Sequence, residues 1–196
     1  MKKKIYDFII IALIIALVIV LALLAIRYGR NYINEKDVEE TLSIIEQEFE
    51  KSDKKNENEI LDVEYKGYKV EGIIEIPKID IKYPILNVTN EDAMKISITK
   101  FWGPDANEIG NFTMAGHNNK DGTMFGKTKY LQIGDIIKIT NLKNETIEYK
   151  VFKIYTIEPN DVSIVESVEP DTREITLITC TNGHANRLIT KAREVK

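Results

Sequence analysis

The chain has 196 residues, enough for one ordinary domain and an additional segment, because domains commonly contain about 100–200 residues. Apolar residues make up 43% and charged residues 30% of the sequence, a balance that excludes both a disordered chain and a protein embedded wholly in a membrane. The net charge is −4, and residues 1–30 hold five basic side chains but only one acidic one, so the remainder is distinctly acidic. Nucleic-acid binding is therefore not expected, since neutralising phosphates requires a basic surface.

An unbroken apolar run, FIIIALIIALVIVLALLAI, occupies residues 8–26. As a helix with a rise of about 1.5 Å per residue, this run nearly crosses the roughly 30 Å hydrocarbon core of a membrane. It is too long, and its end too poor a cleavage site, for a removable signal peptide. Three lysines precede it, so the positive-inside rule places residues 1–7 in the cytoplasm and the body outside. We expect a single-pass plasma-membrane protein with a transmembrane signal anchor and an extracellular body.

Residues 27–68 differ in composition from the segments on either side. Four apolar residues recur here at the spacing of one helix face, which predicts a short helix that stands off the membrane or packs on the body. These residues are Val38, Leu42, Ile45 and Phe49. The polar run Lys51–Glu59 predicts a flexible connection. The whole segment is therefore expected to be an extracellular helical and charged linker.

Short β-type runs separated by turn signals fill residues 69–196. The strand candidates are Gly72–Ile76, Ile79–Leu86, Asn111–Gly116, Ile136–Thr140, Thr146–Ile157, Glu174–Cys180 and Arg187–Ala192. One helix is expected over Asn90–Ile98, with Asn90 as its N-terminal cap. About seven or eight strands at this spacing predict a mostly antiparallel β-barrel or sandwich with one or two short helices.

Cys180 is the only cysteine, which excludes an internal disulfide. A single cysteine is often an inert, buried apolar side chain. Cys180, however, ends a β-branched strand just before a polar loop, where scaffolds present reactive groups. Because a free thiol has a pKa near 8.5, catalysis requires a neighbouring base or cation.

The two histidines and one arginine are candidates for that neighbour. His117 is preferred as the base, because Ala115 and Gly116 before it permit close approach of another backbone. His184 is expected to be a secondary contact or simply solvated. If the last two predicted strands pair as a hairpin, Arg187 faces Cys180 across the turn, and its guanidinium can hold a developing oxyanion or a substrate carbonyl.

These residues resemble the motifs of the sortase family. Thr176–Cys180 (TLITC) matches the TLxTC nucleophile motif, Ala115–His117 matches the segment that carries the catalytic histidine, and Arg187 lies where the catalytic arginine opens the final strand. Further similarity is found in Ile76–Ile79, Tyr83–Ile85 and Leu131–Asp135. The resemblance extends over about residues 72–196, and the N-terminal anchor agrees with it.

The resemblance implies a closed eight-stranded sortase-type β-barrel over residues 69–196. It implies an enzyme that cleaves LPxTG-like C-terminal sorting signals between Thr and Gly. Cys180 is then the nucleophile that forms a thioacyl-enzyme, His117 the acid/base, and Arg187 the group that stabilises the oxyanion or substrate. The implied substrate-binding residues are Thr179, Ile178 and Ala115. The acceptor is an amine of a peptidoglycan precursor or a pilin lysine.

Class A or class D is favoured within the family. The stretch between Asp161 and Glu174 is too short for the helical insertion of class B, and neither the lid motif of class C nor a C-terminal anchor is evident. Some class A members bind calcium near acidic loops. Asp105, Glu108 and Glu166 are candidates here, but three scattered carboxylates do not amount to a site. We predict neither a metal nor another cofactor.

Two alternatives remain open from the residues alone. One is an extracellular cysteine peptidase or an L,D-transpeptidase-like enzyme, although the latter expects a His-Gly pair before the cysteine, and here Gly183-His184 follows it. The other is a non-catalytic, membrane-anchored β-domain that binds cell-wall partners.

Overall fold

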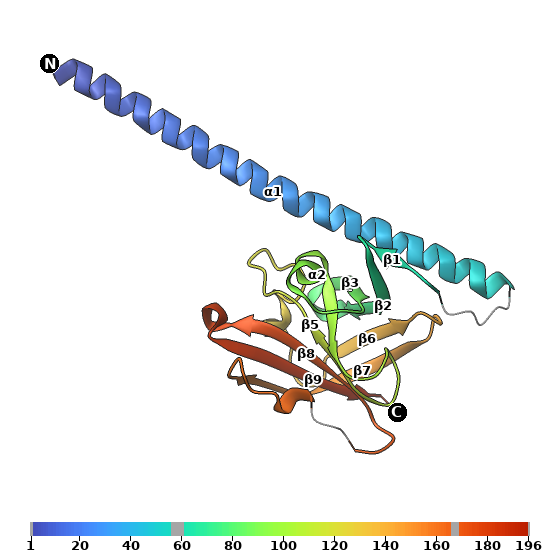
Figure 1. Cartoon of the computed structure of the whole chain (residues 1–196). Helices are drawn as coiled ribbons and strands as arrows, with labels where there is room; N and C mark the ends of the chain where they lie inside the picture. The colour runs from blue at the N-terminus through green and yellow to red at the C-terminus, as the bar shows by residue number, and fades with distance from the viewer. Residues whose placement is uncertain (1, 56–60, 166–168, 196) are drawn as a thin grey trace. The chain divides into compact units, whose positions relative to one another are not determined.

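The computed structural model describes residues 2–55, 61–165 and 169–195. The chain forms two compact units, Met1–Glu40 and Thr41–Lys196. Helix α1 (Lys2–Lys55) supplies the first unit and continues into the second (Figure 1). Its segment Tyr6–Ile26 is exposed throughout and is long and apolar enough to cross a membrane. The predicted apolar run is therefore helical along its whole length.

The part of α1 that belongs to the second unit has one buried face. Leu42, Ile45 and Phe49 are each 8% exposed or less. At the edge of this face, Glu46 forms an exposed ion pair with Lys82 of the body, with 2.6 Å between Oε1 and Nζ. The predicted helical stripe is thus confirmed, and its residues within this unit pack on the body. Residues 56–60 of the predicted flexible connection lie outside the described residues.

The sheet has nine strands, eight of which close into a barrel. The strands are β1 (Glu64–Tyr65), β2 (Tyr68–Ile76), β3 (Ile81–Leu86), β4 (Ile98–Trp102), β5 (Gly110–Ala115), β6 (Ile136–Asn141), β7 (Thr146–Ile157), β8 (Arg173–Thr181) and β9 (Asn186–Glu194). Their order is β1-β2-β3-β4-β5-β8-β9-β7-β6, and β6 also pairs with β2. This last pairing closes the ring from β2 to β9, with the two-residue β1 as an addition to β2. The expected eight-stranded barrel is confirmed.

Most neighbouring strands are antiparallel, but β3–β4 and β5–β8 are parallel pairs. The sequence did not reveal β4. The predicted helix is shorter than expected: α2 (Glu91–Ile96) begins after Asn90, whose side chain accepts a hydrogen bond from the backbone N–H of Ala93 at 2.8 Å. The cap is therefore confirmed, but the predicted helix end is wrong. Strand β4 starts two residues after α2 without an intervening Gly or Pro, so no turn signal separates them.

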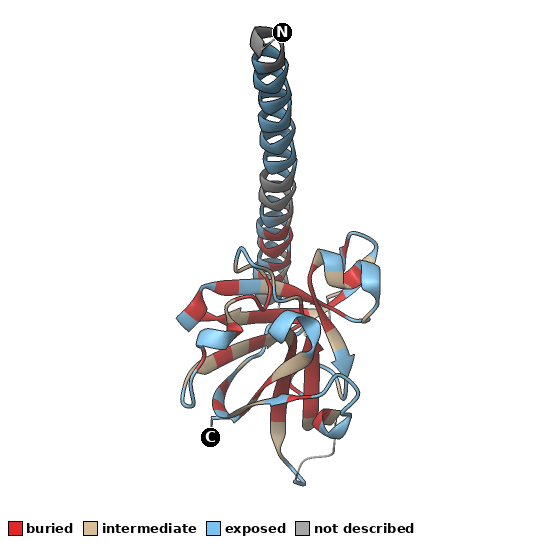
Figure 2. Ribbon diagram, turned by 90° about the vertical axis from the view of Figure 1, so that its left-hand side faces the viewer, coloured by how far each residue is buried: buried red, intermediate tan, exposed pale blue. Residues whose placement is uncertain are grey.

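The barrel interior is filled by aliphatic and aromatic side chains. Ile74, Ile85, Phe112 and Phe125 are all 1% exposed or less, as expected for an eight-stranded barrel whose lumen is just wide enough for side chains. The strands carry most of the buried residues, shown in red in Figure 2.

A second, smaller apolar cluster lies on another face of the sheet. Its buried members are Ile157, Ile164, Ile178 and Ile189. Side chains alternate between faces along a strand, so Leu177 of β8 joins the interior cluster, while Ile178 joins this second one. Cys180 follows two positions after Ile178 and therefore shares its face.

Candidate active site

The parallel pair β5–β8 brings the base candidate beside the thiol. The ladder runs from Gly110↔Arg173 to Ala115↔Ile178, and it continues with a hydrogen bond of 3.1 Å from Gly116 N to Ile178 O. On the other side of His117, the side chain of Asn118 donates to the carbonyl of Cys180 at 2.7 Å. The segment that carries His117 is therefore held to β8 on both sides and runs beside Cys180.

The antiparallel pair β8–β9 brings the arginine to the same place. Cys180 is directly paired with Arg187. Directly opposed side chains have Cβ atoms about 4.5–5.5 Å apart. The hairpin expected from the sequence is therefore present, with Arg187 across the turn from the thiol.

The β8–β9 loop holds the guanidinium of Arg187. One nitrogen, Nη1, donates to the carbonyls of His184 at 3.1 Å and Asn186 at 3.2 Å. This loop makes a tight reversal in which Asn182, Gly183 and His184 all have positive φ. The side chain of His184 is exposed. Arg187 is thus oriented by its own loop through Nη1.

His117 is half-buried, and its surroundings favour the neutral imidazole. Burial is the main cause that lowers the pKa of His117 below its usual value, and the positive charges of His184 and Lys95 lower it further. Cys180 is a free thiol of intermediate exposure. A neutral imidazole next to an accessible thiol is an arrangement that can accept the thiol proton.

The three residues expected to bind substrate surround this pair. Ala115 and Ile178 are registered partners, 6% and 8% exposed, and lie two positions before His117 and Cys180 on their strands. Thr179 is 4% exposed, and its Oγ1 donates to the carbonyl of Gly116 at 2.7 Å. Their role toward substrate stays a prediction.

Asn118 is a site residue that the sequence interpretation missed. Its side-chain Nδ2 donates to the backbone carbonyl of Cys180 at 2.7 Å. In the sequence, Asn118 and Asn119 are simply polar residues that follow the predicted strand Asn111–Gly116. The contact depends on the parallel register of β5 and β8, which no short-range pattern predicts.

Of the acidic residues considered for calcium, Asp105 and Glu108 line one pocket together with Glu71. Asp105 forms an ion pair with Lys100 at 2.6 Å, and Lys100 also contacts the carboxylate of Glu71 at 3.3 Å. The ammonium is the main cause that lowers the pKa of Asp105, whereas burial raises that of Glu71. Glu166 lies outside the described residues, and within those residues no three His, Cys, Asp or Glu side chains form a metal-binding group. The absence of a metal stays a prediction.

Known proteins match both the sequence and the fold. The Sortase domain family model matches residues 74–195. Sortase A of Staphylococcus aureus (strain NCTC 8325 / PS 47) is 24% identical over 185 residues, which cover 92% of this chain and 89% of that protein. Sortase D of Bacillus subtilis (strain 168) is 30% identical over 112 residues, which cover 56% of this chain and 53% of that protein.

Two solved structures are similar over most of the barrel. A Sortase D5 transpeptidase from Clostridium perfringens has a TM-score of 0.63 at 29% identity, covering 83% of this chain and 98% of that one. Sortase A from Corynebacterium diphtheriae has a TM-score of 0.60 at 27% identity, covering 66% of this chain and 62% of that one.

The matched segment covers more than half of the chain and contains all the strands that meet at Cys180. Both the non-catalytic β-domain and the L,D-transpeptidase-like enzyme are thereby set aside. The chain belongs to the sortase family of cysteine transpeptidases, and its relatives include sortases of classes A and D.

Proposed function

We propose that this sortase cleaves LPxTG-like sorting signals between Thr and Gly and transfers the acyl group to an amine. The acceptor is an amine of a peptidoglycan precursor or a pilin lysine. The observation that supports this most directly is the adjacency of β5, β8 and β9: Cys180 pairs with Arg187, and the segment that carries His117 is hydrogen-bonded to β8 on both sides.

The proposed reaction needs two acyl transfers. The thiolate of Cys180 attacks the Thr carbonyl, the C–N bond to Gly breaks, and the leaving amine takes a proton from His117. The incoming amine then loses its proton to His117 and attacks the thioester, which releases the thiolate. Arg187 holds the negative oxygen of each tetrahedral intermediate. The side chains supply and recover every proton, so the proposal includes no cofactor.

The apolar cluster beside the thiol supports a role in substrate binding. Ile178 belongs to it and Ala115 pairs with Ile178, so a strip of apolar side chains leads to Cys180. Such a strip suits the Leu and Pro of a sorting signal, because both lack side-chain hydrogen-bonding groups. Thr179 borders it from the nucleophile's own strand.

The proposed cellular arrangement follows the anchor. Residues 8–26 span the plasma membrane, residues 1–7 lie in the cytoplasm, residues 27–68 are the extracellular linker, and residues 69–196 are the catalytic domain. The exposed apolar helix Tyr6–Ile26 supports this arrangement.

Substitutions at the three site residues test the function. In detergent micelles, the full chain should cleave a quenched fluorescent LPxTG-type peptide, and Cys180→Ala should abolish cleavage. His117→Ala and Arg187→Ala should each lower kcat/KM by about 10²–10⁴-fold, the usual range for removing an acid/base or oxyanion group. Unchanged thermal unfolding would show that the fold survives.

His184→Ala is the matched control and should cleave at nearly the wild-type rate at neutral pH. Peptide cleavage by Cys180→Ala would show that Cys180 is not the nucleophile. If His184→Ala lost peptide cleavage while His117→Ala kept it, His184 would instead be the base.

A further inference from the structure

The backbone hydrogen bonds between β5 and β8 stop just before the catalytic residues. In a parallel pair, one strand donates every second N–H to the same neighbour at even spacing. Gly116 N donates to Ile178 O, so the next bond of this ladder would run from Asn118 N to Cys180 O. The Cys180 carbonyl is occupied instead by the side-chain amide of Asn118, at 2.7 Å.

The backbone of His117 and Asn118 does not pair with β8 but with the segment that contains Met124 and Phe125. Asn118 forms a β-bridge with Met124, and the carbonyl of His117 accepts a hydrogen bond of 3.0 Å from Phe125 N. Phe125 is fully buried in the core, so this turn is anchored to the barrel interior.

Packing against the core and a contact on the near side fix the position of this turn further. An added Cβ on Gly116 would approach the Phe125 ring to 2.8 Å, so the backbone lies flat against that ring. On the near side, Thr179 Oγ1 donates to Gly116 O at 2.7 Å. His117 therefore lies between two ties to β8, one at Gly116 and one at Asn118.

A carboxamide reaches farther than a backbone N–H. When the Asn118 side chain takes the place of the ladder bond, the two backbones separate at the level of His117 and Cys180 while the acceptor stays satisfied. The hydrogen bond from Asn118 thus ties the segment that carries His117 directly to the backbone of Cys180.

We propose that Asn118 is a positioning residue of this sortase: its carboxamide clamps the carbonyl of Cys180 to the His117 segment and sets the separation of thiol and imidazole. The proposal rests on the proposed acyl transfer. Asn118 does not touch the reacting atoms and acts through the two residues it joins.

A series of isosteric and longer side chains separates this role from simple packing. Asn118→Asp keeps the shape but replaces the donor with a carboxylate that repels the Cys180 carbonyl. Asn118→Gln keeps the donor on a chain longer by one methylene. Asn119→Ala is the control, because its side chain bonds within the turn and not to β8.

The variants should be compared as full chains in detergent micelles. We expect Asn118→Asp to lower kcat for the quenched peptide about 10- to 100-fold with KM within about twofold, because a displacement of about 1 Å at a reacting pair has this effect. Asn118→Gln should recover part of the loss, and Asn119→Ala should match the wild type. Equal kcat for Asn118→Asp and wild type would overturn the proposal, as would a loss confined to KM.

A substrate-free measurement keeps this test separate from the proposed function. The pH profile of Cys180 alkylation by iodoacetamide reports how His117 acts on the thiol, with His117→Ala as the uncoupled reference. In Asn118→Asp the profile should move toward that reference, even if no sorting peptide is cleaved. A profile identical to the wild type, with His117→Ala clearly different, would refute the clamp. Failure of wild-type cleavage alone would refute only the proposed substrate.

Discussion

The surroundings of His117 act on its charge state. Burial disfavours its protonated form, and the nearby positive charges of His184 and Lys95 act in the same direction. In the proposed mechanism, His117 must carry a proton when the leaving amine departs. A lowered pKa therefore reduces the protonated fraction at neutral pH but makes each proton easier to release.

Removal of the charge at position 184 should be visible in the titration of His117. His184→Ala removes a like charge, so the pKa of His117 should rise. In the pH profile of kcat/KM, the decrease caused by deprotonation of His117 should then occur at higher pH. The imidazole Cε1 proton can be followed by NMR, and assignment is direct because the chain has two histidines and the variant only one. An unmoved His117 titration would show that His184 does not act on it.

Single residues with distinctive chemistry could be selected from the sequence as candidates, and their catalytic roles stay predictions. Cys180 and Arg187 are paired across the β8–β9 hairpin, and the segment that carries His117 is hydrogen-bonded to β8 beside them. Asn118 could not be predicted, because asparagine after a strand is common and its acceptor lies 62 residues away in the chain. Such a contact can be predicted only once the pairing of β5 with β8 is known, and the local sequence does not reveal which strands pair.

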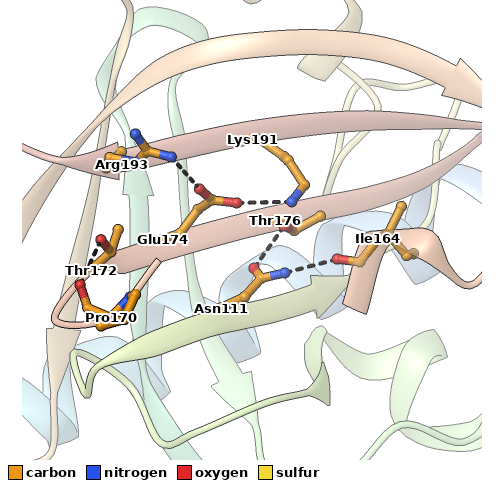
Figure 3. A network of polar contacts seen from close by, with 8 residues as sticks. All are labelled: Asn111, Ile164, Pro170, Thr172, Glu174, Thr176, Lys191 and Arg193. Carbon is orange, nitrogen blue, oxygen red and sulfur yellow. Dashed lines mark hydrogen bonds and ion pairs between the residues drawn. The ribbon is translucent and has the colours of Figure 1, made fainter. Parts of the chain in front are cut away.

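Strands β8 and β9 are also joined far from the thiol, through a buried carboxylate. Glu174 is 3% exposed and contacts Lys191 at 2.8 Å and Arg193 at 3.1 Å, both on β9 (Figure 3). Beside it, Thr176 Oγ1 donates to Asn111 of β5, and Asn111 donates to the carbonyl of Ile164. Three elements that build the site are thus cross-linked at the opposite end of the same strands.

Neutralising this carboxylate should loosen the hairpin. Glu174→Gln keeps the shape but leaves the partly buried ammonium of Lys191 without a counter-charge, so we expect a loss of about 2 kcal/mol in the free energy of unfolding. Urea unfolding measures it as a lower midpoint at an unchanged slope. Glu148→Gln is the matched control, because its ion pair with Lys138 is exposed and should contribute little. Equal losses in both variants would contradict the structural role of Glu174.

At the level of elements, strands with turns on both sides were predictable and β4 was not. Period-two patterns and Gly or Pro boundaries marked most of the barrel. Strand β4 begins directly after a helix, and its five residues are too few to show alternation. The parallel pairs β3–β4 and β5–β8 were also not foreseen, because a pattern of strands does not state which strands will be neighbours.

The orientation of the whole molecule can be tested with its single thiol. Cys180 is the only cysteine and has intermediate exposure, so a membrane-impermeant maleimide reports the side of the membrane on which the barrel lies. Intact cells should be labelled as strongly as permeabilised ones, and Cys180→Ser should remain unlabelled. Labelling only after permeabilisation would place the barrel in the cytoplasm and reverse the proposed topology.

The strand order also has a consequence for folding. Strands β8 and β9 follow all the other strands in the chain, yet they insert between β5 and β7 in the sheet. Pairings between segments so distant in sequence form slowly. Until β8 and β9 are inserted, the barrel is open and Cys180 is separated from the segment that carries His117. Catalytic competence should therefore be among the last properties acquired during folding.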